Sequence, residues 1–362
     1  MIYFISWRVL TVATLFVILC HLFSTPSGVR AQTVRDVVQS VNGLSSVARH
    51  QKLVEGAKRE GRAVFYGTVN AAHARKILDG FKRRYPFLTI GHYRAGGFRL
   101  INKVVTEARS QRFEPDVIQT SALVGHELIR GNLVAKYFSP ERKHLRREFY
   151  DKNGLWTAMQ HVRVALGYNT TLVKVEDAPK SYHDLLDPKW KGKVVIDNQD
   201  QDVLSALIDA WGEEKAFALF KGLEKNQVSI RRSRTLQAQL LVAGEFHIAA
   251  FLHGYKPAGM KRAGAPVNIA TLAPFVTKPS PIFLAKHAPH PHASILLYDY
   301  LLSEDNQKIV AEEIGRGPVR NGIKEKYPEL KHDRYQIVNP DTAGPKLRDL
   351  RKFFNKVFGI TG

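Results

Sequence analysis

The chain has 362 residues, of which 44% are hydrophobic, and carries a formal net charge of +21 at pH 7. Its length suggests two lobes or domains with a large buried core, and its single cysteine, Cys20, excludes a fold stabilised by internal disulfides. The excess of cations favours an acidic partner, an anionic ligand or an anionic membrane surface, and it carries no information about the fold.

The first 31 residues have the pattern of a secretory signal peptide. Arg8 is followed by an uncharged apolar run from Val9 to Cys20. The segment ends on Val29-Arg30-Ala31, which has small residues at the positions that a signal peptidase recognises for cleavage. A membrane span would need roughly 20 apolar residues, so a retained anchor is the less favoured alternative. The sequence therefore predicts an exported protein whose mature chain begins at Gln32.

Strands and helices alternate with short links from about residue 60. Ile77, Leu78 and Phe81, for example, share one face of an expected helix. The segments expected in this half are strands at 63–66, 87–93 and 116–120, and helices that end at Tyr85, begin at Gly96-Gly97 and cover 122–130. Strands separated by helices of this length imply βαβ units and a mainly parallel sheet.

A strand at 161–168 is followed by a polar segment, after which the alternation restarts at Val194. The segments expected here are strands at 194–196, 228–231, 247–252 and 267–272, and helices at 203–210, 214–223, 236–243, 293–302 and 305–313. We therefore expect an α/β fold of two lobes joined by two crossings, near 161–169 and 277–286. The expected bounds are 1–31 for the signal peptide, 50–165 plus 280–330 for the first lobe, 170–276 for the second lobe and 331–362 for a C-terminal extension.

Several short motifs follow one another in a fixed order between about 50 and 320. They are EGRAVFY at 60–66, YRAGG at 93–97, DLLDPKWKGK at 184–193, VAGE at 242–245 and APHP at 288–291. Together they resemble the periplasmic solute-binding proteins of ABC importers, in particular the branch that binds ferric iron, polyamines and thiamine. The resemblance implies a two-lobed periplasmic-binding-protein-like fold, with a ligand cleft between the lobes that closes by a hinge. It also implies a periplasmic monomer without a cofactor, which captures a small ligand and delivers it to an ABC transporter permease at the inner membrane.

Loops that follow strands are the candidates for the first wall of the cleft. In α/β sheets, ligands bind beyond the carboxyl ends of the strands, where helix N-termini point at them. The residues selected on this basis are Thr68, Asn70, Gly96, Gly97, Thr120 and Ser121. The glycines would let backbone N–H groups approach an anion closely, whereas the alternative for the polar residues is plain helix capping.

The second lobe offers acidic residues after a strand and arginines before a helix. A calcium loop is excluded, because Asp202 and Ile208 stand where glycine and glutamate would be needed. Asp197 or Asp200 is expected to face a cationic or hydroxyl-bearing ligand. Arg234 suits bidentate binding of a carboxylate or phosphate, with a solvated surface as the alternative.

The chain departs from the iron-binding members of the resembling family near Tyr255. Those members have two adjacent tyrosines about ten residues after a Gly-Glu pair, and the corresponding positions here are Gly254 and Tyr255, with His253 beside them. A single phenolate coordinates ferric iron poorly, because this ion favours several anionic oxygen ligands. We therefore expect no directly bound metal, a colourless protein, and an organic anion, an amine or a metal chelate as the ligand. His253 and Tyr255 complete the predicted site, facing Asp197 and Arg234.

No catalytic motif is complete in this sequence. The helix from His126 to Arg130 nearly matches a zinc-protease motif, but Arg130 stands where the second histidine is required. The chain is therefore predicted not to be an enzyme. The alternative function is a basic exported protein that binds nucleic acid or another polyanion through the charge runs at 82–84 and 142–147, although no nucleic-acid-binding motif is present.

Overall fold

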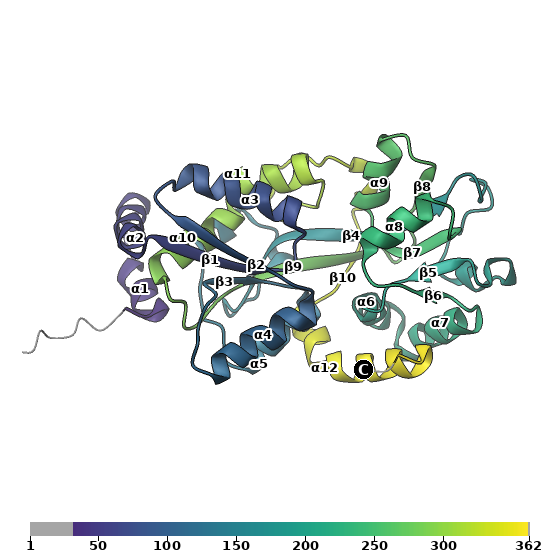
Figure 1. Ribbon diagram of the computed structural model, residues 1–362, viewed down its shortest axis with the longest axis horizontal. Helices are drawn as coiled ribbons and strands as arrows, with labels where there is room; N and C mark the ends of the chain where they lie inside the picture. The colour runs from purple at the N-terminus through teal and green to yellow at the C-terminus, as the bar shows by residue number, and fades with distance from the viewer. Residues whose placement is uncertain (1–31, 361–362) are drawn as a thin grey trace, which may run out of the picture. The chain divides into compact units, whose positions relative to one another are not determined.

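The computed structural model describes residues 32–360, and the predicted signal peptide lies outside this range. Within the described range, no helix combines the length and the apolar content that a membrane crossing requires. Figure 1 shows a sheet that runs through two halves of the protein, with helices packed around it.

The order of elements confirms the alternation of strands and helices. The helices are α1 (Val34–Val41), α2 (Ser46–Glu60), α3 (Ala71–Arg84), α4 (Gly97–Arg109), α5 (Ala122–Arg130), α6 (Gln201–Trp211), α7 (Glu213–Lys225), α8 (Arg234–Val242), α9 (Tyr255–Arg262), α10 (Pro291–Leu302), α11 (Glu304–Lys308) and α12 (Pro340–Phe358). The strands are β1 (Arg62–Gly67), β2 (Thr89–Arg94), β3 (Val117–Gln119), β4 (Thr157–Asn169), β5 (Val194–Ile196), β6 (Ser229–Ile230), β7 (Ile248–His253), β8 (Val267–Ala270), β9 (Val276–Leu284) and β10 (Gln336–Ile337). A π-helical turn, Ile309–Ile314, continues α11.

The sheet has the order β2-β1-β3-β9-β4-β7-β5-β6, with β10 on β9 and β8 on β4. In the first half β1 pairs in parallel with β2 and β3, and in the second half β5 pairs in parallel with β6 and β7. β4 and β9 instead pair antiparallel with each other, and they also pair antiparallel with β7, β8 and β3. The sheet is therefore mixed: the pairings among the other strands are parallel as expected, but two crossings in opposite directions place an antiparallel pair at its centre.

β4 and β9 carry the chain from one half to the other. All thirteen residues of β4 are buried. Its first part pairs with β9, from Thr157 opposite Ile282 to Arg163 opposite Thr277, and its second part pairs with β7 and β8. The two halves of the protein therefore meet along this strand pair.

The buried apolar side chains form two large clusters, one in each half. The first cluster contains Phe65, Phe81 and Phe283, together with residues of α1 to α5 and α10. The second contains Phe220 and Phe251, together with residues of β5, β7, α6 and α7. Each half thus has its own core, as a two-lobed protein requires.

Helix α12 forms from the segment that the sequence analysis left as an extension without assigned structure. Asn339 caps it by accepting a hydrogen bond from the backbone N–H of Asp341, and Pro340 occupies its first turn. Leu347, Leu350 and Phe354 are buried in the second cluster. The helix contacts α5 of the first half and α6 and α7 of the second half, and in Figure 1 it runs along the bottom from beside α5 to below α7. The sequence analysis also missed α1, α2 and α9.

Candidate ligand-binding site

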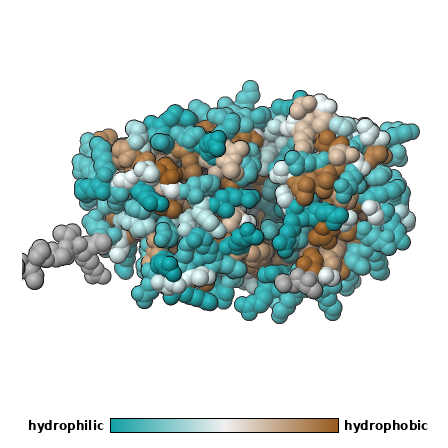
Figure 2. All heavy atoms as spheres, viewed as in Figure 1, coloured by the Kyte–Doolittle hydropathy of each residue, from teal (hydrophilic) through white to brown (hydrophobic). Residues whose placement is uncertain are grey.

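A cleft of about 320 Å³ lies between the two halves of the sheet. The space-filling view in Figure 2 shows the hollow near the middle of that face, with hydrophilic residues on both sides. All ten residues predicted for the site line this cleft: Thr68, Asn70, Gly96, Gly97, Thr120, Ser121, Asp197, Arg234, His253 and Tyr255. Their placement matches the expectation that loops after strands would meet here, and their binding roles stay a prediction.

The first wall is built from the starts of three helices. Asn70 caps α3 by accepting a hydrogen bond from the backbone N–H of His73 (2.9 Å). Gly96 and Ser121 stand at the N-caps of α4 and α5 without any side-chain cap bond. Helix capping, the alternative for these polar residues, therefore accounts for Asn70 but not for Ser121.

Gly96 and Thr120 leave polar groups available in this wall. The φ of Gly96 is −68°, so its backbone does not require glycine, and a Cβ atom there would meet no protein atom within 4 Å. The open space lies next to the free N–H groups at the start of α4. Thr120 is fully buried, and its Oγ1 has no hydrogen-bond partner among residues 32–360. Gln119 lies beside it and accepts hydrogen bonds from the N–H and the hydroxyl of Thr68 (both 3.0 Å).

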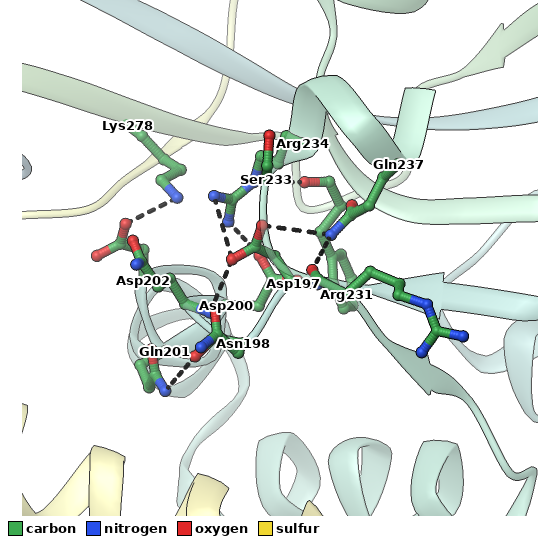
Figure 3. Close-up of polar contacts among 12 residues, drawn as sticks. Asp197, Asn198, Asp200, Gln201, Asp202, Arg231, Ser233, Arg234, Gln237 and Lys278 are labelled. Carbon is green, nitrogen blue, oxygen red and sulfur yellow. Dashed lines mark hydrogen bonds and ion pairs between the residues drawn. The ribbon is translucent and has the colours of Figure 1, made fainter. Parts of the chain in front are cut away.

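The second wall begins with a buried ionic cluster around Arg234, shown in Figure 3. The guanidinium of Arg234 contacts the carboxylate of Asp200 and lies 3.9 Å from that of Asp197. Gln237 donates a hydrogen bond to Asp197 Oδ2 (3.2 Å). Burial raises the pKa of Asp200 to about 6, although the charge of Arg234 opposes this shift. Asp197 and Asp200 therefore largely compensate the positive charge of Arg234, and Arg234 largely compensates theirs.

Lys278 and Asp202 form a second pair in this wall, with Nζ 2.7 Å from the carboxylate (Figure 3). Burial and the nearby Arg234 lower the pKa of Lys278, whereas Asp202 raises it. Lys278 lies on β9 and Asp202 on α6, so the pair fixes α6 against the crossing strand.

Four other cations reach the cleft without a carboxylate partner. They are Arg94, Arg232, Lys256 and Arg316, and none of them forms an ion pair within the described part of the chain. Lys256 Nζ donates to Thr235 Oγ1 (2.6 Å), and Arg316 Nη2 donates to the phenol oxygen of Tyr255 (3.2 Å). The charges of the paired residues nearly cancel one another, so these four cations give the cleft a net positive charge.

Tyr255 lies at the first position of α9 and is 8% exposed. Burial raises the pKa of its phenol, but the charges of Arg316 and Lys256 outweigh burial, so the net shift is downward. Its ring centroid lies 5.9 Å from that of His73 and 6.1 Å from that of His253. Burial, reinforced by nearby cations, lowers the pKa of His73 to about 3 and that of His253 well below its usual value. Both imidazoles are therefore neutral at pH 7.

The sequence analysis missed several residues of the cleft. Arg94 directly precedes a predicted glycine loop and Lys256 directly follows Tyr255, so a wider window at each strand end would have included both. Arg316 follows a π-helical turn and is remote in sequence from the strand ends that were considered. Arg231, another arginine before α8, points away from the ionic cluster in Figure 3.

The comparisons with known proteins agree with this architecture. Residues 107–343 match the model of a family described as bacterial extracellular solute-binding protein. Iron uptake protein A1 of Synechocystis is 25% identical over 235 residues, which make up 56% of this chain and 61% of that protein. The chain thus spans less than two thirds of the length of this relative.

Two solved structures share the fold over nearly their whole length. Iron-bound HitA from Pseudomonas aeruginosa has a TM-score of 0.72 at 21% identity, covering 82% of this chain and 99% of HitA. AfuA from Actinobacillus pleuropneumoniae, with fructose-6-phosphate bound, has a TM-score of 0.72 at 21% identity, covering 83% of this chain and all of AfuA. The predicted two-lobed periplasmic-binding-protein-like fold is confirmed. With the match to the family model, it follows that this chain belongs to the bacterial extracellular solute-binding proteins.

Proposed function

We propose that this protein captures a small organic anion in the cleft between its two halves. The observation that carries the proposal is the charge of the cleft. Within the part of the chain that the structure describes, Arg94, Arg232, Lys256 and Arg316 have no carboxylate partner, whereas the acidic residues nearby are paired. Unpaired cations held at a partly enclosed site attract an anion strongly, and arginine can bind a carboxylate or a phosphate through two hydrogen bonds.

The helices around the cleft support the same ligand class. Six of them, α3, α4, α5, α6, α8 and α9, begin with residues at or next to the cleft. The first N–H groups of a helix have no partner within the helix, and its dipole places partial positive charge at this end. Phosphate and carboxylate groups bind at such ends. A volume of about 320 Å³ suits a small molecule.

A ferric ion is the competing ligand, since the relatives include an iron uptake protein and an iron-bound structure. Among residues 32–360, Tyr255 is the one tyrosine that lines the cleft, and cations surround it. Hard trivalent iron is stabilised by several anionic oxygen ligands. AfuA, with its bound sugar phosphate, illustrates that the same fold can hold an anionic ligand. We therefore favour a phosphate ester, a phosphonate or a carboxylate over a bare metal ion.

The proposed cycle is closure on the ligand followed by delivery to an ABC importer in the bacterial inner membrane. The two core clusters would act as the lobes, with first-lobe bounds near 50–165 and 280–330 and second-lobe bounds near 170–276. Closure would bend β4 and β9, the strands along which the halves meet. We place the protein in the periplasm as a monomer, in keeping with the family and with the predicted signal peptide.

A thermal-shift screen followed by calorimetry tests this function. The probes are 2-aminoethylphosphonate, fructose-6-phosphate, citrate, ferric citrate, spermidine and thiamine. At least one anion should raise the melting temperature and bind with 1:1 stoichiometry, because a ligand of the folded state stabilises it. Replacing the unpaired cation in Arg94→Gln should weaken that anion about tenfold or more, whereas the exposed control Arg59→Gln should leave its affinity unchanged.

Two outcomes would overturn the proposal. One is stabilisation by spermidine or thiamine with no response to any anion. The other is tight binding of single-stranded DNA with affinity that falls steeply with salt, which would favour the polyanion alternative. The family match does not support that alternative.

A further inference from the structure

Tyr255 already has a cation of the protein beside its phenol. Arg316 Nη2 donates a hydrogen bond to Tyr255 Oη at 3.2 Å, and the centre of the guanidinium lies 5.2 Å from the ring centroid. Lys256 Nζ lies 5.3 Å from the same centroid. A phenol in this environment has its oxygen lone pairs directed at a guanidinium and its ring face occupied by cations.

The backbone that carries Arg316 is fixed from the first half of the protein. The N–H of Arg316 donates to the carbonyl of Val310 (3.0 Å), and Gly317 exchanges two hydrogen bonds with His161 on β4 (2.8 and 2.9 Å). Gly315 has a φ of +81°, and a Cβ atom there would meet the ring of Tyr327 at 2.2 Å. Arg316 is therefore held in place independently of Tyr255, which belongs to α9 of the second half.

The guanidinium of Arg316 has donors that no protein acceptor uses. Its Nε is buried and has no hydrogen-bond partner among the residues that the structure describes. A buried donor without an acceptor lowers the stability of the fold, unless a ligand accepts its hydrogen bond. Arg316 lines the cleft and is half-buried, and its other terminal nitrogen, Nη1, has no hydrogen-bond partner within residues 32–360. Arg316 can therefore bind Tyr255 through Nη2 and donate from Nη1 to an oxyanion in the cleft.

We propose that Arg316 determines the selectivity of the cleft, because it occupies the position beside Tyr255 that a ferric ion would need and offers its remaining donor to an anion. This inference rests on the proposed function, since it explains which ligands the cleft accepts. The groups that could otherwise hold iron are the phenol of Tyr255 and the neutral imidazoles of His73 and His253. A trivalent ion placed among them would be repelled by Arg316 and Lys256.

Replacing Arg316 should therefore change the preference of the cleft from anions towards iron. The probe for iron is ferric nitrilotriacetate, and the probe for anions is whichever anion of the screen binds the wild type. Wild-type protein should stay colourless with the iron probe. Arg316→Met should bind it at least tenfold more tightly and develop the visible charge-transfer band of a tyrosinate–iron bond, while anion affinity falls about tenfold.

Four further variants make the result specific. Adding Tyr255→Phe to Arg316→Met should abolish the band, because the ligand oxygen is lost. Arg316→Lys restores a cation and should remain colourless. Arg316→Gln removes the charge but keeps polar atoms, so it should gain iron as Arg316→Met does and takes its place if Arg316→Met fails to fold. Lys261→Met removes an exposed positive charge from the same helix as Tyr255 and should behave as the wild type.

The outcomes separate this inference from the proposed function. A wild-type protein that develops the band as strongly as Arg316→Met would overturn the inference, and so would a folded Arg316→Met with no gain in iron affinity. If no anion of the screen binds the wild type but Arg316→Met still gains iron and the band, the role of Arg316 stands and the proposed function fails.

Discussion

His161 shows how a single buried side chain makes this fold sensitive to acid. The ring is 0% exposed, stacks on Phe149 with centroids 4.9 Å apart, and contacts Arg146 Nη2 through Nε2 (3.0 Å). Burial lowers its pKa well below the usual value, and the charges of Arg163 and Arg146 add to the effect. The imidazole is therefore neutral in the folded state at pH 7.

This pKa shift predicts a loss of stability in mild acid. Below a pH of about 6.5 the unfolded chain binds a proton at this histidine and the folded protein does not, so the free energy of unfolding falls with pH. The contribution of His161 at pH 5 is at most about 2 kcal/mol, the limit set by the pKa of the unfolded chain. Urea unfolding at pH 7 and pH 5 measures the difference for the wild type and for His161→Gln, which should lose less stability on acidification. Equal losses in both proteins would contradict the assignment.

At the scale of elements, the start of α4 combines a glycine with unpaired N–H groups facing open space. Gly96 has an ordinary helical-entry conformation and no neighbouring protein atom near its missing Cβ. The absence of a side chain at Gly96 therefore keeps the cleft open in front of α4, and the packing of the helix does not require it. This is the feature that the sequence motif at 93–97 encodes locally.

A side chain at Gly96 should block the cleft while leaving the fold intact. Gly96→Leu would place four carbon atoms where the ligand approaches α4, and we expect ligand affinity to fall by about 1–3 kcal/mol, the usual cost of overpacking. Its unfolding free energy should fall by no more than about 1 kcal/mol, the cost of a poorer helix cap. Calorimetry and urea unfolding measure the two effects, with Gly96→Ala as the smaller step. Unchanged affinity in Gly96→Leu would place the ligand elsewhere.

For the whole molecule, α12 is the element that contacts both halves on their outer side. It packs on α5 of the first half and on α6 and α7 of the second, and Asp341 near its start accepts a hydrogen bond from the indole of Trp156 (3.2 Å). The family match ends at residue 343, so most of this helix lies beyond it. The predicted C-terminal extension is thus an integral part of the described fold.

Truncating the core of α12 should destabilise the protein as a whole. Phe354 is 0% exposed and packs against Phe220 and Phe358. Phe354→Ala should lower the free energy of unfolding by about 3–5 kcal/mol, through lost apolar burial and the cavity left behind. The exposed Lys352→Ala on the same helix should change it by less than about 0.5 kcal/mol. Urea unfolding distinguishes the two, and a near-neutral Phe354→Ala would mean that α12 does not stabilise the core.

Much of the fold followed from local sequence patterns. Continuous apolar runs located β1 and β5 within a residue of their ends, because both strands are buried on both faces, and α5 covers the expected range 122–130. The strand-end rule brought all ten predicted site residues to one cleft. Family membership also confirms that the chain is a binding protein and not an enzyme.

The sequence by itself determined the alternation of strands and helices, the residues at the strand ends and the departure from two adjacent tyrosines at Tyr255. The tertiary structure decided which charged side chains of the cleft remain without an ion-pair partner. Arg234 and Asp197 were predicted to face a ligand, but Asp200 lies close enough to Arg234 to share its charge. Arg316 comes to Tyr255 from 61 residues away in the chain. Local patterns specify where a backbone segment turns, whereas charge compensation depends on distances between segments that only the packed sheet brings together.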